Sequence, residues 1–206
     1  MEVKNIFENE PNSKITEKLL EIGFTKKFED GEVILDEQSF IKAIPIVLSG
    51  NVRVMRTDDD DREILLYYIQ PGESCIMSFL GGMHQDTSKI KAIAEDETEL
   101  LFIPVDSLGH LMKNFPEWLD YIFKLYHKRF EELLEVVNAI AFKKLDTRLF
   151  DLLKLKSELV HSKLIHVTHE QLAKELGTVR VVVSRLLKQM EEVGMIELGR
   201  NKITLM

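Results

Sequence analysis

The sequence predicts an α+β protein built from an antiparallel, jelly-roll-like β-roll, a long helix and a carboxy-terminal winged helix-turn-helix. Three observations predict this fold class. Apolar residues alternate over residues 28–104, they recur every three or four positions over 117–142, and two short helical patterns followed by a hairpin occupy 168–206. We place the three parts at 1–115, 116–145 and 146–206.

The first part reads as short strands separated by turns. The turn residues are Gly31, Ser49-Gly50-Asn51 and Pro71-Gly72, at intervals typical of an antiparallel roll or barrel. The alternating strand residues are Val33 with Leu35, Ile44 with Ile46, Val52 with Val54, and Ile64 with Leu66 and Tyr68. The acidic run Asp58 to Asp61 lacks the ligand spacing of a calcium loop, so we interpret it as a solvated hairpin tip.

From Pro116 the period becomes that of a long helix, with proline near its first turn. Two neighbouring apolar stripes run along it, and one can pack on the strand domain while the other meets a partner helix. We assign the dimer seam to Ile122, Tyr126, Arg129, Leu133, Val136 and Ile140. The second stripe contains Phe123, His127, Phe130, Leu134, Val137 and Ala141. A helix buried on two sides within one monomer is the alternative.

Two helices joined by a tight turn follow in the last part. Thr168 and Gln171 have the spacing of a capping box, which predicts the start of the first helix. Gly177 is placed to end it, and Thr178 to cap the second helix. The second helix packs through the apolar residues Val182, Val183, Leu186, Leu187 and Met190.

The opposite face of the second helix suits the major groove of DNA. Its outward residues are Arg180, Val181, Ser184, Arg185 and Lys188. Ile196 and Leu198, a Gly199-Arg200-Asn201 turn, and Ile203 and Leu205 alternate as a two-stranded wing. We predict DNA contacts from that face together with Thr178, Arg200 and Lys202, against the alternative of an ordinary helical hairpin with a solvated polar face.

Charge is distributed unevenly along the 206 residues, which carry a net charge of −8. Residues 143–206 contain twelve Lys and Arg against eight Asp and Glu, a net charge of +4, so the remainder carries −12. Because residues 1–142 are acidic, they should repel DNA, and only residues 143–206 are expected to bind it.

Composition and missing motifs exclude several classes of protein. The stretch Met1 to Pro11 lacks a secretory apolar region and no apolar run could span a bilayer, so we expect a cytoplasmic protein without membrane contact. Cys75 is the only cysteine, which excludes an intramolecular disulfide, a Cys-rich zinc site and an iron–sulfur cluster held by this chain. The histidines show no metal-ligand spacing, and no catalytic motif is present, so we expect neither a metal nor an enzyme.

Taken together, these segments resemble the Crp/Fnr family of bacterial transcription regulators over nearly the whole chain. The most specific matches are LSGNVRV and PGE in the first part and SRLLKQMEEVGMI after the turn. The resemblance implies a cyclic-nucleotide-binding-like sensor domain, a dimerisation helix and a DNA-binding domain. In the family, a ligand in the roll changes how the long helices pack and hence how the recognition helices sit.

The resemblance also suggests individual DNA contacts. Arg180 matches an arginine that commonly contacts DNA, and Ser184 with Arg185 matches the usual Ser-Arg or Gly-Arg pair. Arg185 is the first choice for a two-bond contact with guanine. Val181 stands where most members have a glutamate that accepts a hydrogen bond from cytosine, so the usual operator is not expected.

The ligand pocket implied by the resemblance departs further from the family. Met77 stands where cyclic-nucleotide-binding members have the glutamate that holds the ribose, and no arginine occurs between Arg62 and Arg129 to hold the phosphate. We assign the pocket to Cys75, Met77, Thr87 and Ser88 and predict no useful affinity for cyclic AMP. Haem is not expected, because haem-binding members place Cys and His close together. Cys75 is either an inert buried thiol or a redox sensor.

We therefore predict a homodimeric transcription regulator that binds a partly palindromic site in double-stranded promoter DNA. RNA polymerase is a further candidate partner, and the small-molecule effector is unknown. One rival is a ligand-binding regulatory subunit whose helix-turn-helix binds another protein. A second rival, a cupin-like enzyme, would need clustered metal ligands that the sequence does not offer.

Overall fold

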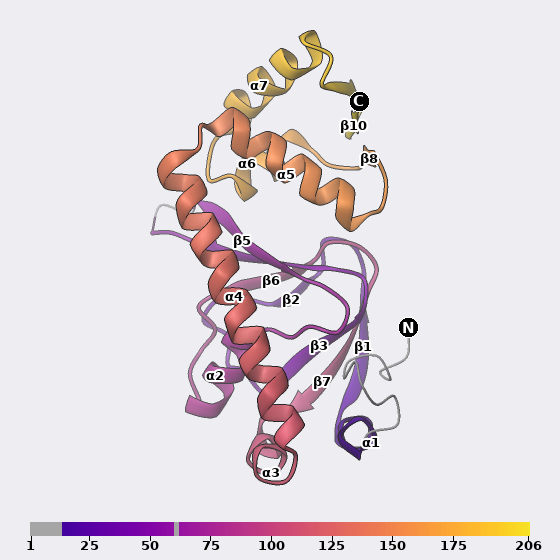
Figure 1. The fold of residues 1–206 in the computed structure, drawn as a ribbon, viewed down its shortest axis with the longest axis vertical. Coiled ribbons are helices and arrows are strands. Elements are labelled where there is room, and N and C mark those ends of the chain that lie inside the picture. Colours follow the sequence, from indigo (N-terminus) through magenta and orange to yellow (C-terminus); the bar gives the residue numbers. More distant parts are fainter. Residues whose placement is uncertain (1–13, 60–61) are drawn as a thin grey trace. The chain divides into compact units, whose positions relative to one another are not determined.

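The computed structural model describes residues 14–59 and 62–206, and its contacts divide the chain into two compact units (Figure 1). The first unit consists of the chain up to residue 56 together with 66–133. The second consists of 57–65 together with 134–206. The long helix α4 (Pro116–Phe142) begins in the first unit and ends in the second, as the sequence predicts from its period.

The β-roll lies in the first unit, where the described residues place the helix α1 before it and two short helical segments, η2 and α3, after it. Its elements are α1 (Lys14–Ile22), β1 (Phe24–Phe28), β2 (Val33–Leu35), β3 (Ala43–Ser49), β4 (Val52–Thr57), β5 (Glu63–Ile69), α2 (Ile76–His84), β6 (Lys91–Ala94), β7 (Thr98–Pro104), η2 (Val105–Ser107) and α3 (Leu108–Asn114). The tip of the β4–β5 hairpin belongs to the second unit.

Two antiparallel sheets form the roll, with strand orders β1-β7-β3 and β2-β6-β4-β5. The alternation read from the sequence is confirmed in β3 and β4, where Ile44, Ile46 and Val54 are fully buried, but not in β2, where Val33 is exposed, nor in β5, where Ile64 and Leu66 are half-buried. The turn at Gly50 has a φ of 77°, and the Asp96 carboxylate secures it by accepting hydrogen bonds from the Asn51 backbone at 2.7 Å and amide side chain at 2.8 Å. This turn therefore ties β3 and β4 to the loop before β7.

A helix within the roll was not anticipated: α2 stands where strands were predicted throughout 28–104. Its sequence, IMSFLGGMH, is apolar without a polar face, so the helical period is hidden. Two glycines let it approach its surroundings. A Cβ on Gly82 would lie 2.7 Å from Val105 Cγ2, and one on Gly81 would collide with the Ile41 side chain.

The carboxy-terminal fold lies in the second unit. Its elements are α5 (Leu145–Leu159), β8 (Leu164–Ile165), α6 (His169–Glu175), α7 (Arg180–Glu192), β9 (Ile196–Gly199) and β10 (Lys202–Leu205). The sheet has the order β8-β10-β9, so the predicted two-stranded wing gains a third, short strand. Asn201, with a φ of 54°, closes the turn between β9 and β10.

One core joins the helices of this unit to the wing. Fully buried residues include Leu149 and Leu153 of α5, Leu172 of α6 and Leu187 of α7, and Ile203 of β10 packs with them. Burial of these side chains supplies most of the stability of such a small domain. The three helices and the wing are thus held as one body that presents the remaining face of α7 outward.

Part of the predicted acidic tip can be described. Asp58 accepts hydrogen bonds from the Arg62 backbone at 2.9 Å and from Arg62 Nε at 2.8 Å. Asp60 and Asp61 lie outside the described residues, as does the stretch Met1 to Pro11. Across the described ranges, no helix is both long and apolar enough to cross a bilayer.

Candidate DNA-binding surface, dimer helix and ligand pocket

Two short-range sequence signals, a capping-box spacing and a glycine, predict where the helix α6 of the α6–α7 pair begins and ends. The Thr168 hydroxyl accepts a hydrogen bond from the Gln171 backbone at 3.1 Å, as the capping-box spacing predicts. Gly177 adopts a φ of 66° at the predicted end of α6. This left-handed backbone favours glycine at position 177, where the chain turns from α6 toward α7.

The start of α7 differs from expectation. The helix begins at Arg180, and Val179 occupies the position before it without a side-chain hydrogen bond to the helix. Thr178 lies one residue further out, where its backbone N–H donates to the Ala173 carbonyl at 2.9 Å. The prediction that Thr178 caps α7 is therefore wrong. The first amide groups of α7 lack a side-chain cap, which leaves the helix start suited to an anion such as a DNA phosphate.

The two faces of α7 separate as predicted. Val183, Leu187 and Met190 are buried against α5 and α6. Arg180, Val181, Arg185 and Lys188 are exposed, and Ser184 is half-buried. The structure thus brings the predicted reading residues together on one outward face, with Val181 at 78% exposure as its apolar member. In the wing, Arg200 and Lys202 are also exposed.

Ser184 is held by a residue that the sequence analysis did not single out. His169 Nδ1, at the start of α6, lies 2.9 Å from the Ser184 hydroxyl. Partial burial lowers the pKa of His169 below its ordinary value, and the positive charge of Arg180 lowers it further. The spacing of fifteen residues hides this pair in the sequence, because only the fold brings the start of α6 against the middle of α7.

Lys188 is engaged on its own helix. Its ammonium binds the Glu191 carboxylate at 2.7 Å, and the other oxygen of Glu191 accepts a hydrogen bond from the Leu198 backbone at 3.1 Å. The hydrogen bond with Glu191 raises the pKa of Lys188, and the same bond lowers the pKa of Glu191. A DNA phosphate near Lys188 therefore competes with Glu191 for the ammonium.

A buried ion pair lies behind the reading face. Lys156 of α5 and Glu175 of α6 are 2% and 4% exposed, and their charged atoms are 3.1 Å apart. Two charges at this depth fix the two helices against each other only while both are present. Arg148 of α5 adds a hydrogen bond of 3.1 Å to the Leu176 carbonyl at the end of α6.

The hairpin segment 57–65 also contacts α6 within the second unit. Glu63 lies 3.1 Å from the Lys174 ammonium, and Ile64 forms an isolated antiparallel bridge with Leu176. Among the described residues of the hairpin, Glu63 thus contacts α6 through an ion pair and Ile64 meets its end through a backbone bridge, and Leu65 packs against the core of the second unit.

The structure contradicts the assignment of the first stripe of α4 to a dimer seam. Ile122 is 3% exposed and Arg129 is fully buried, so neither can meet a partner helix. Tyr126 and Leu133 are partly buried, and both pack against core residues of the roll in the same chain. Val136 is half-buried, and only Ile140 of the predicted seam is exposed.

The second stripe of α4 faces outward instead. Phe123 is 69% exposed, Phe130 62%, Leu134 53% and Val137 63%, with His127 and Ala141 also exposed. Such a row of large apolar side chains is uncommon on a free surface. Both stripes have the period of a coiled coil, so the period alone does not tell which of them the roll covers.

Arg129 is buried because it joins α4 to the roll. Its guanidinium donates to the Tyr68 carbonyl at 2.7 Å, contacts the carboxylates of Glu73 and Glu132, and lies 4.7 Å from the centre of the Tyr67 ring. Burial raises the pKa of Glu132, against the opposite pull of Arg129 and Lys128. Glu73 is the glutamate of the PGE motif, so this motif anchors the long helix.

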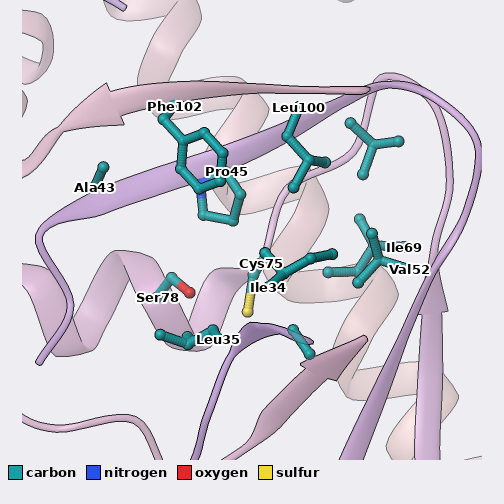
Figure 2. A pocket seen from close by; sticks show the side chains of 12 residues that line it. Ile34, Leu35, Ala43, Pro45, Val52, Ile69, Cys75, Ser78, Leu100 and Phe102 are labelled. Atoms are coloured by element: carbon teal, nitrogen blue, oxygen red, sulfur yellow. The ribbon is translucent and has the colours of Figure 1, made fainter. Parts of the chain in front are cut away.

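The predicted pocket residues are dispersed. A cavity inside the roll is lined by residues of β2 to β7 and α2, and Cys75 is the one of the four predicted residues that lines it (Figure 2). Met77 packs beside the core, Thr87 pairs with Phe40 across a bridge, and the buried Ser88 hydroxyl donates to the Ile90 carbonyl at 2.7 Å. Within the described ranges, no group of three or more His, Cys, Asp or Glu side chains is placed to hold a metal ion.

Comparison with known proteins assigns both halves of the chain. Residues 25–115 match the family model described as a cyclic nucleotide-binding domain. Residues 147–206 match the one described as a Crp-like helix-turn-helix domain. A roll of this type joined to such a helix-turn-helix defines a DNA-binding transcription regulator.

Individual relatives agree with this class. The Cyclic AMP receptor protein of Thermus thermophilus is 27% identical over 173 residues, which cover 84% of this chain and 79% of that protein. The structure of a Crp/Fnr-family regulator from Eubacterium rectale is 26% identical, has a TM-score of 0.83, and matches over 94% of this chain and 90% of that one. The chain belongs to the Crp/Fnr family of transcription regulators.

A third relative supports the fold. The structure of the c-di-GMP-responsive regulator CLP of Xanthomonas campestris has a TM-score of 0.82 over 92% of this chain and 96% of that one, at 21% identity. The order of roll, long helix and helix-turn-helix is thus shared at low sequence identity.

Proposed function

We propose that this regulator acts in the cytoplasm as a homodimer, that it reads a two-fold promoter site through α7, and that it does not depend on cyclic AMP. The observation that carries the proposal is the outward face of α7, where Arg180, Arg185 and Lys188 are exposed beside an uncapped helix start. Guanidinium groups on such a face can make paired hydrogen bonds with guanine. Contact with RNA polymerase belongs to the same proposal and stays a prediction.

The second stripe of α4 supports the homodimer. Its exposed aromatic and aliphatic residues would be covered by the same stripe of a second copy, since a two-fold axis places identical surfaces against each other. A two-fold dimer also presents two copies of α7, which suits two half-sites one turn of DNA apart. Phe130 and Val137 are two of its most exposed apolar residues, at 62% and 63% exposure.

The roll supports independence from cyclic AMP. The cavity is lined by apolar side chains together with Cys75 and Ser78, and the buried Arg129 is already engaged by Glu73 and Tyr68. A cyclic phosphate buried without a cationic partner is strongly disfavoured. We therefore expect calorimetry to detect no tight binding of cyclic AMP, and tight binding would contradict this part of the proposal.

Selection of bound genomic fragments, followed by sequencing, tests DNA reading directly. We expect enrichment of a two-fold sequence motif, and we expect the same motif with or without cyclic AMP. Val179 and Val181, at 63% and 78% exposure, favour one rival: an α7 that binds another protein. That rival predicts weak, salt-sensitive binding with no enriched motif, and this result would overturn the proposal.

A further inference from the structure

A hydrogen bond between two side chains joins the start of α6 to the reading face of α7. His169 is the first residue of α6, and its Nδ1 lies 2.9 Å from the hydroxyl of Ser184 in the second turn of α7. Both side chains are half-buried. The neighbouring contacts between the two helices are apolar, because Leu172 and Val183 belong to one buried core. The bond therefore adds a fixed direction where apolar packing supplies none.

Ser184 lies on the face where α7 carries its cations. Arg180 stands four positions before Ser184, and residues at this spacing are neighbours on the surface of a helix. Arg185 follows Ser184 directly, and both arginines are exposed. The charge of Arg180 also acts on His169, which places all three side chains in one neighbourhood. Ser184 therefore forms part of the surface that a nucleic acid bound by these arginines would contact.

The His169 ring acts here as a neutral hydrogen-bond partner. Burial lowers its pKa, and the positive charge of Arg180 lowers it further, so the ring is uncharged at about pH 7.5. A neutral imidazole does not attract a phosphate as a lysine or an arginine does. The role that the geometry gives to His169 is to hold the Ser184 hydroxyl.

A serine hydroxyl that is held distinguishes bases better than one that rotates. The hydroxyl has one hydrogen to donate and lone pairs that accept, and it turns about its C–O bond unless a partner fixes it. Because Nδ1 of His169 occupies one of these directions, only the remaining ones are open to another molecule. Base edges in the major groove differ in their pattern of donors and acceptors, so a fixed hydroxyl matches some base pairs and not others.

From this bond we infer that His169 is a positioning residue for DNA recognition: it fixes the Ser184 hydroxyl, and the fixed hydroxyl discriminates at one base pair of each half-site. The inference rests on the proposed function, because it specifies how the outward face of α7 reads DNA. It goes further by assigning part of the sequence discrimination to a contact between α6 and α7.

Two substitutions at His169 separate the loss of the hydrogen bond from the loss of the ring. His169→Phe keeps a ring without nitrogen atoms, whereas the amide of His169→Asn places a polar atom close to the position of Nδ1. The probes are the duplex selected by the wild-type protein, its single-base-pair variants and a random duplex of equal length. Fluorescence anisotropy with the full-length protein gives an affinity for each duplex.

Ser184→Ala should lose about fivefold of the discrimination at one base pair of each half-site, the ratio that one net hydrogen bond supplies. His169→Phe should lose about the same ratio at the same base pair, with affinity for the random duplex within about twofold of the wild type. His169→Asn should restore the discrimination to within about twofold. The double variant His169→Phe/Ser184→Ala should lose no more than Ser184→Ala, because the two side chains act as one unit.

His166→Phe is the matched control, since His166 is an exposed histidine three residues before His169 and lies outside the bond. This variant should keep the discrimination of the wild type. Thermal unfolding of each variant shows that it is folded before its affinities are compared. If His169→Phe does not fold, His169→Gln replaces it with the same expectation, because the longer amide lies nearer the place of Nε2 than that of Nδ1.

A purely structural role of His169 predicts equal losses on every duplex, the random one included, and that result contradicts the inference. The inference also fails if Ser184→Ala loses no discrimination, if His169→Phe keeps what Ser184→Ala loses, if His169→Asn does not restore it, or if the losses add in the double variant. Any of these results together with a selected motif contradicts the inference alone. A wild-type protein that selects no motif contradicts the proposed function, and with it the inference.

Discussion

At the residue scale, the proposed DNA contacts of α7 divide between those that would distinguish bases and those that would hold the DNA backbone. Arg185 is exposed on the outward face of α7, whereas the Lys188 ammonium already binds the Glu191 carboxylate. Arg185→Ala should cost about 1–3 kcal/mol of discrimination at one base pair of the selected site. Titration of specific and single-substituted DNA duplexes measures this loss.

Lys188→Ala serves as the control for that measurement. It removes the proposed phosphate contact of Lys188 and should weaken binding to all sequences alike, with a smaller salt dependence. Equal losses on specific and random DNA for Arg185→Ala would contradict the role assigned to Arg185.

His169 should make the stability of the second unit depend on pH. Its pKa is lowered in the folded state by burial and by Arg180, so the unfolded chain binds the proton more tightly. Stability should therefore fall as the pH drops through about 6.5, the ordinary value for histidine. Thermal unfolding between pH 7.5 and 5.5 should show a steeper decline for the wild type than for His169→Gln.

The neighbouring His166 provides a control of the same residue type. It is exposed, three residues before His169, and lies outside the contact with Ser184. His166→Gln should keep the pH dependence of the wild type. If His169→Gln keeps it as well, the assignment to His169 is wrong.

The buried pair Lys156–Glu175 predicts an asymmetric response to mutation. Lys156→Met leaves the Glu175 carboxylate buried without this partner and should cost about 3–5 kcal/mol of unfolding free energy. The double variant Lys156→Met/Glu175→Leu removes both charges and should recover most of that loss. Urea unfolding measures both; a double variant no more stable than the single one would show that the charges are not coupled.

The sequence predicts single residues where the signal is local. Thr168 accepts a hydrogen bond from the backbone of Gln171, three residues on, and Gly177 donates to the Lys174 carbonyl, three residues back, so both roles depend on neighbours in the sequence and both are confirmed. The pair His169–Ser184 depends on segments that only the fold brings together, so no spacing in the sequence indicates it.

At the element scale, α4 shows what a periodic pattern can and cannot decide. Its bounds follow from Pro116 and the continuous period, and they agree with the structure. Which of its two stripes packs against the roll cannot be read from the period. The buried stripe includes the charged Arg129, and it can be buried because Glu73 of the roll forms an ion pair with it. Arginine side chains are mostly exposed in folded proteins, so the sequence alone does not indicate that Arg129 is buried.

The exposed stripe of α4 gives a prediction about assembly. Phe130→Asp with Val137→Asp places two carboxylates in the proposed two-fold interface and should convert the dimer to a monomer. Light scattering coupled to size-exclusion chromatography measures the mass. DNA affinity should fall at the same time, since two linked half-site contacts become separate.

Glu135→Lys is the matched control, because Glu135 is exposed on α4 but lies outside the stripe. This variant should remain a dimer. A wild-type protein that is monomeric at micromolar concentration, or a double variant that stays dimeric, would contradict the interface.

The helix α2 is an element that the sequence pattern does not predict. Its two glycines are poor helix formers, and its apolar run gives no amphipathic period. Gly82 is required by the approach of Val105, which is a tertiary constraint. Propensity is a weak guide when packing against other elements decides the conformation.

At the scale of the whole molecule, the charge asymmetry limits how DNA is held. The acidic remainder carries a net charge of −12 and the carboxy-terminal part +4. Five cations per chain belong to the predicted DNA contacts: Arg180, Arg185, Lys188, Arg200 and Lys202. A dimer therefore releases counterions from at most ten phosphates through these groups, and the slope of log K against log salt should not exceed about 9 in magnitude.

Fluorescence anisotropy over a range of salt concentrations measures this slope. A steeper dependence would show that further cations, outside α7 and the wing, contact the DNA. The acidic character of the roll predicts the opposite, since it repels flanking DNA.

Glu73 and the residues that line the cavity have separate roles in the roll, so the cavity residues can be varied in protein engineering. Glu73 ties α4 to the roll through Arg129, whereas the wall residues Leu35, Pro45 and Phe102 take no part in that pair. A library that varies only these walls can therefore search for new small-molecule responses without loosening the helix that links the roll to the DNA reader. Glu73 and Arg129 should be held constant in such a biosensor library, or exchanged together.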